Sequence, residues 1–97
     1  MTPEKILEVV RMYRSRFVAM NVEPRDYPHE ELVIFKQGED PLAHCCGMLP
    51  KMEIFIHEGR IEKAMRWLGF VQGCLWMSGV YSLDDLMSHR RPDESEG

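Results

Sequence analysis

The sequence predicts an all-α protein, a small helical bundle with three main helices and a short C-terminal helix. Three observations indicate this: apolar residues recur every three or four positions near the start, a capping residue followed by proline occurs twice, and a capping-box pattern lies near the end. The chain of 97 residues, 44% of them hydrophobic, is long enough for one compact domain. We expect a single helical domain over residues 1–91, with an irregular connection at 22–40 and a disordered acidic tail at 92–97.

The first helix is expected to begin after Thr2, a good N-cap, because Pro3 suits the first helical position. It should end near Asn21. Its predicted buried stripe consists of Ile6, Val9, Val10, Tyr13, Phe17 and Met20.

Asp40 and Pro41 repeat this signal and predict the start of the second helix, which Gly59 should end as a C-cap. Pro50 lacks an amide donor and its ring crowds the carbonyl one turn earlier, while Gly47 weakens the same turn. The second helix is therefore predicted to kink or split between Gly47 and Pro50.

The third helix is predicted over residues 60–78, and its second half is almost entirely apolar. A helix that is apolar on every side must be buried centrally or shared with another chain. Gly79 should end this helix, and Ser82 with Asp85 predicts a capping box for the short fourth helix.

Gly69 and Gly73 lie one turn apart and remove side chains from one stripe of the third helix. They predict a close-packing interface. We expect the first helix of the same chain to approach there, with the third helix of a second copy in a homodimer as the alternative. Gln72 lies among apolar residues and needs a hydrogen-bond partner, from the protein or from a ligand.

A candidate binding site begins at Arg60, Lys63 and Arg66, three cations beside the indole of Trp67. With Arg14 and Arg16 they could hold a phosphate or stack on a base; the alternative is a solvated first turn beside a half-buried tryptophan. The residues predicted to bind a ligand or partner are His44, Arg60, Lys63, Arg66, Trp67, Gln72 and Trp76.

His44, Cys45 and Cys46 suggest zinc, but adjacent cysteines on a helix point about 100° apart and the usual ligand spacings are missing. The alternative is that the cysteines are small buried apolar residues and that His57 pairs with Glu53 one turn earlier. We expect neither a metal nor a cofactor. No nucleophile and base occur at a recognisable spacing, so the sequence does not predict an enzyme.

Charge and hydropathy exclude further classes of protein. The net charge is -4, whereas a nucleic-acid binder would present a concentrated basic face, so nucleic acid is not an expected partner. No apolar run approaches the length of a membrane helix, and the first residues lack the pattern of a secretion signal. A cytoplasmic location is expected, and three cysteines, two of them adjacent, fit a reducing compartment.

A resemblance adds to these observations. The pairs Ala43-His44 and Met48-Leu49, the run EGRIEKAMRWLGFVQGCLW at 58–76, GVYSLDDL at 79–86 and HRRP at 89–92 resemble a group of small uncharacterised proteins of tailed bacteriophages. The resemblance covers mainly Leu42 to Pro92. It implies a phage or prophage origin and the bacterial host cytoplasm as the place of action.

The leading functional hypothesis is a non-enzymatic phage accessory protein that binds a host protein and modulates host metabolism or defence. The alternative is a small-molecule binder, such as a sponge for nucleotide signals, and a third is a structural metal-binding protein. A homo-oligomer is a further expectation.

Overall fold

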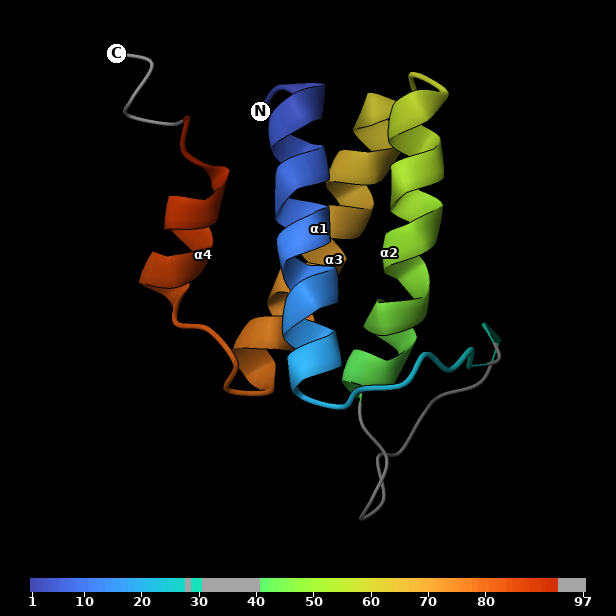
Figure 1. Ribbon diagram of the computed structural model, residues 1–97, viewed down its shortest axis with the longest axis vertical. Coiled ribbons are helices and arrows are strands. Elements are labelled where there is room, and N and C mark those ends of the chain that lie inside the picture. Colours follow the sequence, from blue (N-terminus) through green and yellow to red (C-terminus); the bar gives the residue numbers. More distant parts are fainter. Residues whose placement is uncertain (28, 31–40, 93–97) are drawn as a thin grey trace.

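The computed structural model describes residues 1–27, 29–30 and 41–92, and within these ranges it contains helices and no strand. The four helices are α1 (Pro3–Ala19), α2 (Pro41–His57), α3 (Ile61–Met77) and α4 (Leu83–Arg90). They run alternately down and up, so that consecutive helices are antiparallel (Figure 1). The predicted all-α bundle is confirmed.

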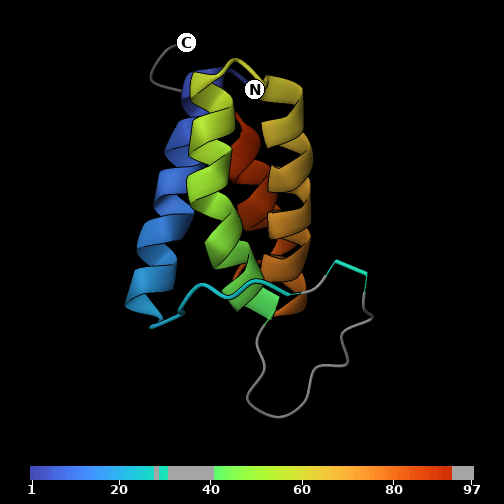
Figure 2. The same ribbon diagram turned by 90° about the vertical axis from the view of Figure 1, so that its right-hand side faces the viewer.

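Helices α1, α2 and α3 pack against one another, whereas α4 contacts α1 and α3 only. Seen from the side of α2, α4 lies behind the other three helices (Figure 2). The short fourth helix therefore covers the flank of the α1–α3 pair that faces away from α2.

Helix α1 begins where the sequence predicts, because the Thr2 hydroxyl accepts a hydrogen bond of 3.1 Å from the Lys5 amide. Five residues of its predicted stripe are buried. Met20 is exposed and lies just beyond the end of the helix, so its inclusion in the stripe is wrong. Arg11 and Arg14 are exposed.

Helix α2 continues through Pro50 without interruption, so it does not split between Gly47 and Pro50. The predicted kink at Pro50 stays a prediction. Pro50 is exposed, while Leu49 and Met52 on either side of it are buried. Because both halves of the helix are anchored in the core, the hydrogen bond that proline removes is lost on the solvent side. The predicted cap at Asp40 lies outside the described residues.

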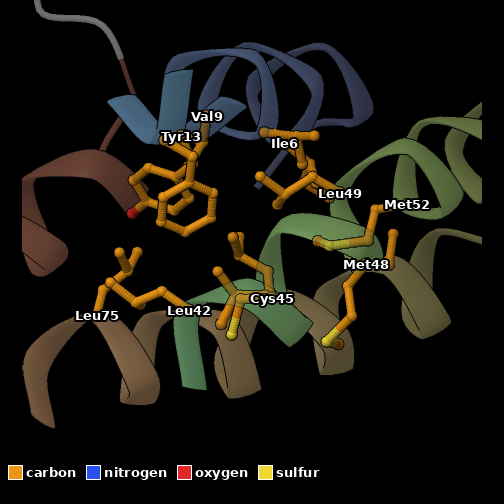
Figure 3. Close-up of a cluster of buried hydrophobic side chains, with 14 of the residues drawn as sticks. Ile6, Val9, Tyr13, Leu42, Cys45, Met48, Leu49, Met52 and Leu75 are labelled. Carbon is orange, nitrogen blue, oxygen red and sulfur yellow. The ribbon is translucent and has the colours of Figure 1, made fainter. Parts of the chain in front are cut away.

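The core is built from side chains of α1, α2 and α3 that converge between the helices (Figure 3). Tyr13, Leu49 and Leu75, one from each helix, are fully buried. Helix α4 adds only Leu86 to this set. The buried apolar residues are Ile6, Val9, Val10, Tyr13, Phe17, Leu42, Cys45, Met48, Leu49, Met52, Ala64, Leu68, Val71, Leu75 and Leu86.

Helix α3 is not buried on every side, which corrects the expectation of a central helix. Its Gly69 and Gly73 are exposed, and a Cβ atom built on Gly73 would have no other atom within 4 Å. At Gly69 the nearest neighbour of such an atom is Arg90 of α4, at 3.7 Å. The prediction that the first helix packs on these glycines is therefore wrong, and the predicted contact with a second copy stays a prediction.

The turns on either side of α3 use glycine as predicted. Gly59 and Gly79 have φ angles of +78° and +74°, a conformation that other residues rarely adopt. At the start of α4, the Ser82 hydroxyl and the Asp85 carboxylate each accept a 3.0 Å hydrogen bond from the other residue's amide. The bond from the Ser82 amide lowers the pKa of the Asp85 carboxylate, and the two bonds together confirm the predicted capping box.

Candidate functional site

Four polar side chains form a hydrogen-bonded network where α1, α3 and α4 meet. The Gln72 amide donates to the Tyr13 hydroxyl at 3.0 Å, and the Arg90 Nε donates to the Gln72 carbonyl oxygen at 2.5 Å. The Tyr13 hydroxyl also lies 2.8 Å from Nδ1 of His89. Both the nitrogen and the oxygen of the Gln72 side-chain amide therefore have a hydrogen-bond partner within the protein, as one of the two predicted alternatives required.

One set of donor directions satisfies every member of the network. Since the Tyr13 oxygen already accepts a proton from Gln72, its own proton is free to be donated to His89. This arrangement requires a neutral His89 that carries its proton on Nε2. The chain of donors thus runs from Arg90 through Gln72 and Tyr13 back to His89, starting and ending on α4.

Burial changes the ionisation of two members of this network. Burial raises the pKa of Tyr13 to about 12, against an opposing effect of the hydrogen bond from Gln72. Burial also lowers the pKa of His89, with the nearby Asp85 carboxylate acting in the opposite direction. Both shifts favour neutral side chains, as the donor directions require. Tyr81 flanks both rings, with centroids 5.7 Å from Tyr13 and 4.8 Å from His89.

An open groove lies beside this network, between α3 and α4. We call it the α3–α4 groove; it has a volume of about 240 Å³ and is lined by Gln72, Gly73, Trp76, Leu83, Leu86, Met87 and Arg90. Three large apolar side chains that line it remain exposed: Trp76 by 48%, Leu83 by 54% and Met87 by 56%. Together they form an apolar surface at the notch that α3 and α4 leave at Gly73.

Two opposite charges stand at the two ends of α4. Arg90 lines the groove and is half-buried, and the only hydrogen bond of its side chain within the part of the chain that the structure describes goes to Gln72. Asp84 is exposed in the first turn and makes no ion pair with any described residue. The groove thus carries a base, and an acid lies at the opposite end of the same helix.

The predicted cation site near the start of α3 forms in part. Lys63 Nζ lies 4.5 Å from the ring centroid of Phe55 and 5.7 Å from that of Trp67, and the Arg60 guanidinium carbon lies 5.1 Å from Phe55. Arg60 also pairs with Glu58 at 3.9 Å. These contacts hold two cations against the protein's own rings. Arg66 lines the shallow hollow there with Arg60 and Lys63.

Arg14 is not part of that site. Its guanidinium lies 2.6 Å from the half-buried Glu53 carboxylate, which also contacts Arg11 at 3.4 Å. The expected pairing of Glu53 with His57 is therefore wrong, because two arginines of α1 take this carboxylate instead. Arg14 cannot join Arg60 in holding a phosphate while it is paired in this way.

His44 lies apart from the other predicted binding residues. Its ring lies 6.0 Å from Tyr27, 6.5 Å from His29 and 6.2 Å from Phe70, measured between centroids. Its Nδ1 atom is buried and makes no hydrogen bond. No group of three or more His, Cys, Asp or Glu residues among those described is placed to hold a metal ion. The metal-binding hypothesis stays a prediction.

The three cysteines differ in environment. Cys45 is fully buried, while Cys46 and Cys74 are half-buried, so the interpretation as small core residues fits Cys45 best. A hydrogen bond from Cys45 lowers the pKa of Cys74 to about 7. Burial raises the pKa of Cys46.

Sequence reasoning missed three members of the polar network: Tyr13, His89 and Arg90. It placed Tyr13 in the apolar stripe, where its ring belongs, and did not ask where its hydroxyl would go. The available signal was the combination of two polar groups, Gln72 and the Tyr13 hydroxyl, on helix faces otherwise made of apolar residues.

Comparisons with protein-family models, with curated proteins and with solved structures find no match to this chain. Among the described residues, none of the helices is both long and apolar enough to cross a membrane.

Proposed function

We propose that this protein works by binding another protein through the α3–α4 groove and the apolar side chains around it. The observation that carries the proposal is the exposure of Trp76, Leu83 and Met87 around an open notch at Gly73. Contiguous apolar patches of this kind mark interaction sites more often than bare surface.

The composition of the patch supports a protein partner. Tryptophan and methionine are enriched at the centres of protein interfaces, and a notch beside a large aromatic side chain is where binding energy concentrates. The rigid network beneath the groove holds Gln72 and Arg90 in fixed positions. A partner would therefore meet a preformed surface and lose little free energy in ordering it.

The partner that we propose is a bacterial host protein, and the protein itself is a phage accessory factor that modulates host metabolism or defence from within the host cytoplasm. The sequence resemblance to small phage proteins supports this choice. The interpretation as a sponge for nucleotides is less well supported, because Arg60 and Lys63 already contact Phe55.

Photo-crosslinking in the bacterial host tests the proposal. A photoreactive amino acid at Leu83 should yield an adduct with a host protein, whereas the same group at Ile54, an equally exposed apolar position on α2, should not. Adding Met87→Glu should abolish the Leu83 adduct. Equal adducts from both positions, or no host adduct from Leu83, would refute the proposed function.

A further inference from the structure

We infer that in the absence of a partner two copies of this chain pair through the α3–α4 groove, with Met87 of α4 next to the two-fold axis. This inference rests on the proposed function in one respect: both assign the same face to protein binding. It adds a regulatory consequence, because a face covered by a second copy is closed to any other protein.

The exposed apolar area at the groove approaches what a dimer needs. Trp76, Leu83 and Met87 together leave on the order of 350 Å² exposed. Each partner in an interface of standard size contributes about 800 Å², of which about 65% is apolar in homodimers. These three side chains therefore supply about two-thirds of the apolar surface that one subunit of such a dimer presents.

The shape of the patch is suited to a copy of itself. A two-fold interface places the same patch on both subunits, so the patch must contain both projections and hollows. Trp76 and Met87 project, and Gly73 provides a hollow with no atom within 4 Å of an added Cβ. The face of α3 that carries Trp76, which is exposed in a single copy, would then be covered.

The charges favour an antiparallel pairing of the two α4 helices, with the two-fold axis perpendicular to them. With the axis next to Met87, the first turn of α4 faces the last turn of the second α4. Asp84 of each copy then lies opposite Arg90 of the other, and neither has an ionic partner among the described residues of its own chain. A parallel pairing would instead bring like charges together.

Sedimentation equilibrium of the untagged protein across the micromolar range tests the inference. The wild-type mass should rise to twice 11.4 kDa with concentration. Met87→Glu places two carboxylates beside the axis and should weaken dimerisation at least a hundredfold. Ile54→Glu on α2 is the matched control and should dimerise like the wild type, and circular dichroism should show that both variants fold. A wild-type monomer at all concentrations, or equal dimerisation of the two variants, would overturn the inference.

A second measurement separates this inference from the proposed function. Met87→Cys should form a disulfide between two copies under mild oxidation, and Ile54→Cys should not; the reverse pattern would contradict the inference. A monomer that still forms the Leu83 adduct with a host protein would overturn the dimer and leave the proposed function standing. A dimer without any host adduct would overturn the proposed function alone.

Discussion

Replacing Tyr13 by phenylalanine removes one oxygen atom from the middle of the network that joins α1, α3 and α4. The ring of Tyr13 is fully buried and would keep its packing, so the substitution changes hydrogen bonding and little else. The Gln72 amide would lose its acceptor, and Nδ1 of His89 would lose its donor. Gln72 is almost entirely buried, so water cannot replace the missing oxygen without opening the helix contact.

The cost follows from these two bonds. Each contributes about 1 kcal/mol net, and a buried donor left without a partner adds about 1 kcal/mol or more, so Tyr13→Phe should lower the free energy of unfolding by about 2 to 3 kcal/mol. In a domain of this size that lowers the melting temperature by roughly 10 to 20 °C. Tyr81→Phe is the matched control: the hydroxyl of Tyr81 makes no hydrogen bond with any described residue, and we expect a loss below about 0.5 kcal/mol.

Urea unfolding followed by circular dichroism at neutral pH measures both variants. The same assay at high pH adds a second readout. Because the pKa of Tyr13 is about 12 in the folded chain and 10.0 ordinarily, its contribution to stability is complete below pH 10. Roughly 3 kcal/mol should be lost as the pH rises from 10 to 12 in the wild type, and this part of the loss should be absent in Tyr13→Phe. A loss below about 0.5 kcal/mol at neutral pH, or identical alkaline profiles, would refute the reasoning.

Three further predictions concern other parts of the molecule. Because burial lowers the pKa of His89, the unfolded chain binds a proton at a higher pH than the folded chain does. The free energy of unfolding should therefore fall as the pH drops below about 6.5. Unfolding experiments at several pH values should show a weaker pH dependence for His89→Gln. Because the hydrogen bond from Cys45 lowers the pKa of Cys74, Cys74 should react with iodoacetamide faster than Cys45 at pH 7. Cys45→Ala should slow the reaction of Cys74, which peptide mass spectrometry measures. Equal rates at Cys74 in the wild type and in Cys45→Ala would contradict the effect of Cys45 on Cys74. Gly73→Ala should raise the free energy of unfolding of the monomer by about 0.5 to 1 kcal/mol, because the added Cβ meets open space. Gly59→Ala should lower the free energy of unfolding, because the φ angle at this position is +78°. Calorimetry of both variants at low protein concentration shows whether each substitution stabilises or destabilises the protein.

The sequence was sufficient for the helices because the signals that define them are local. Thr2 begins α1, Gly59 ends α2 and the Ser82 capping box begins α4, each through contacts within four residues. The split at Pro50 was wrongly predicted because burial of the neighbouring core residues, which depends on the whole bundle, outweighs the local defect.

The candidate site was less accessible to sequence reasoning because its contacts join residues far apart in the chain. Gln72 was identified as needing a partner, yet Tyr13 lies 59 positions away and His89 lies 76 positions from Tyr13. The glycines were interpreted correctly as a stripe but placed on the wrong side, since helical spacing shows which residues share a face and not which way that face points. The cations near Phe55 were found because they are sequence neighbours.

The core residues and the exposed residues around the groove lie largely on different helices, and this affects how the sequence can change in evolution. Of the buried apolar side chains in the described part of the chain, all but Leu86 belong to α1, α2 and α3, while α4 is held by Leu86 and by two polar contacts from His89 and Arg90. Substitutions at Leu83, Asp84 or Met87 would alter the outer surface and leave the core intact. Related sequences could therefore acquire new binding partners through substitutions in one short helix. Selection for partner binding, and not the requirement to fold, would set how fast these positions change.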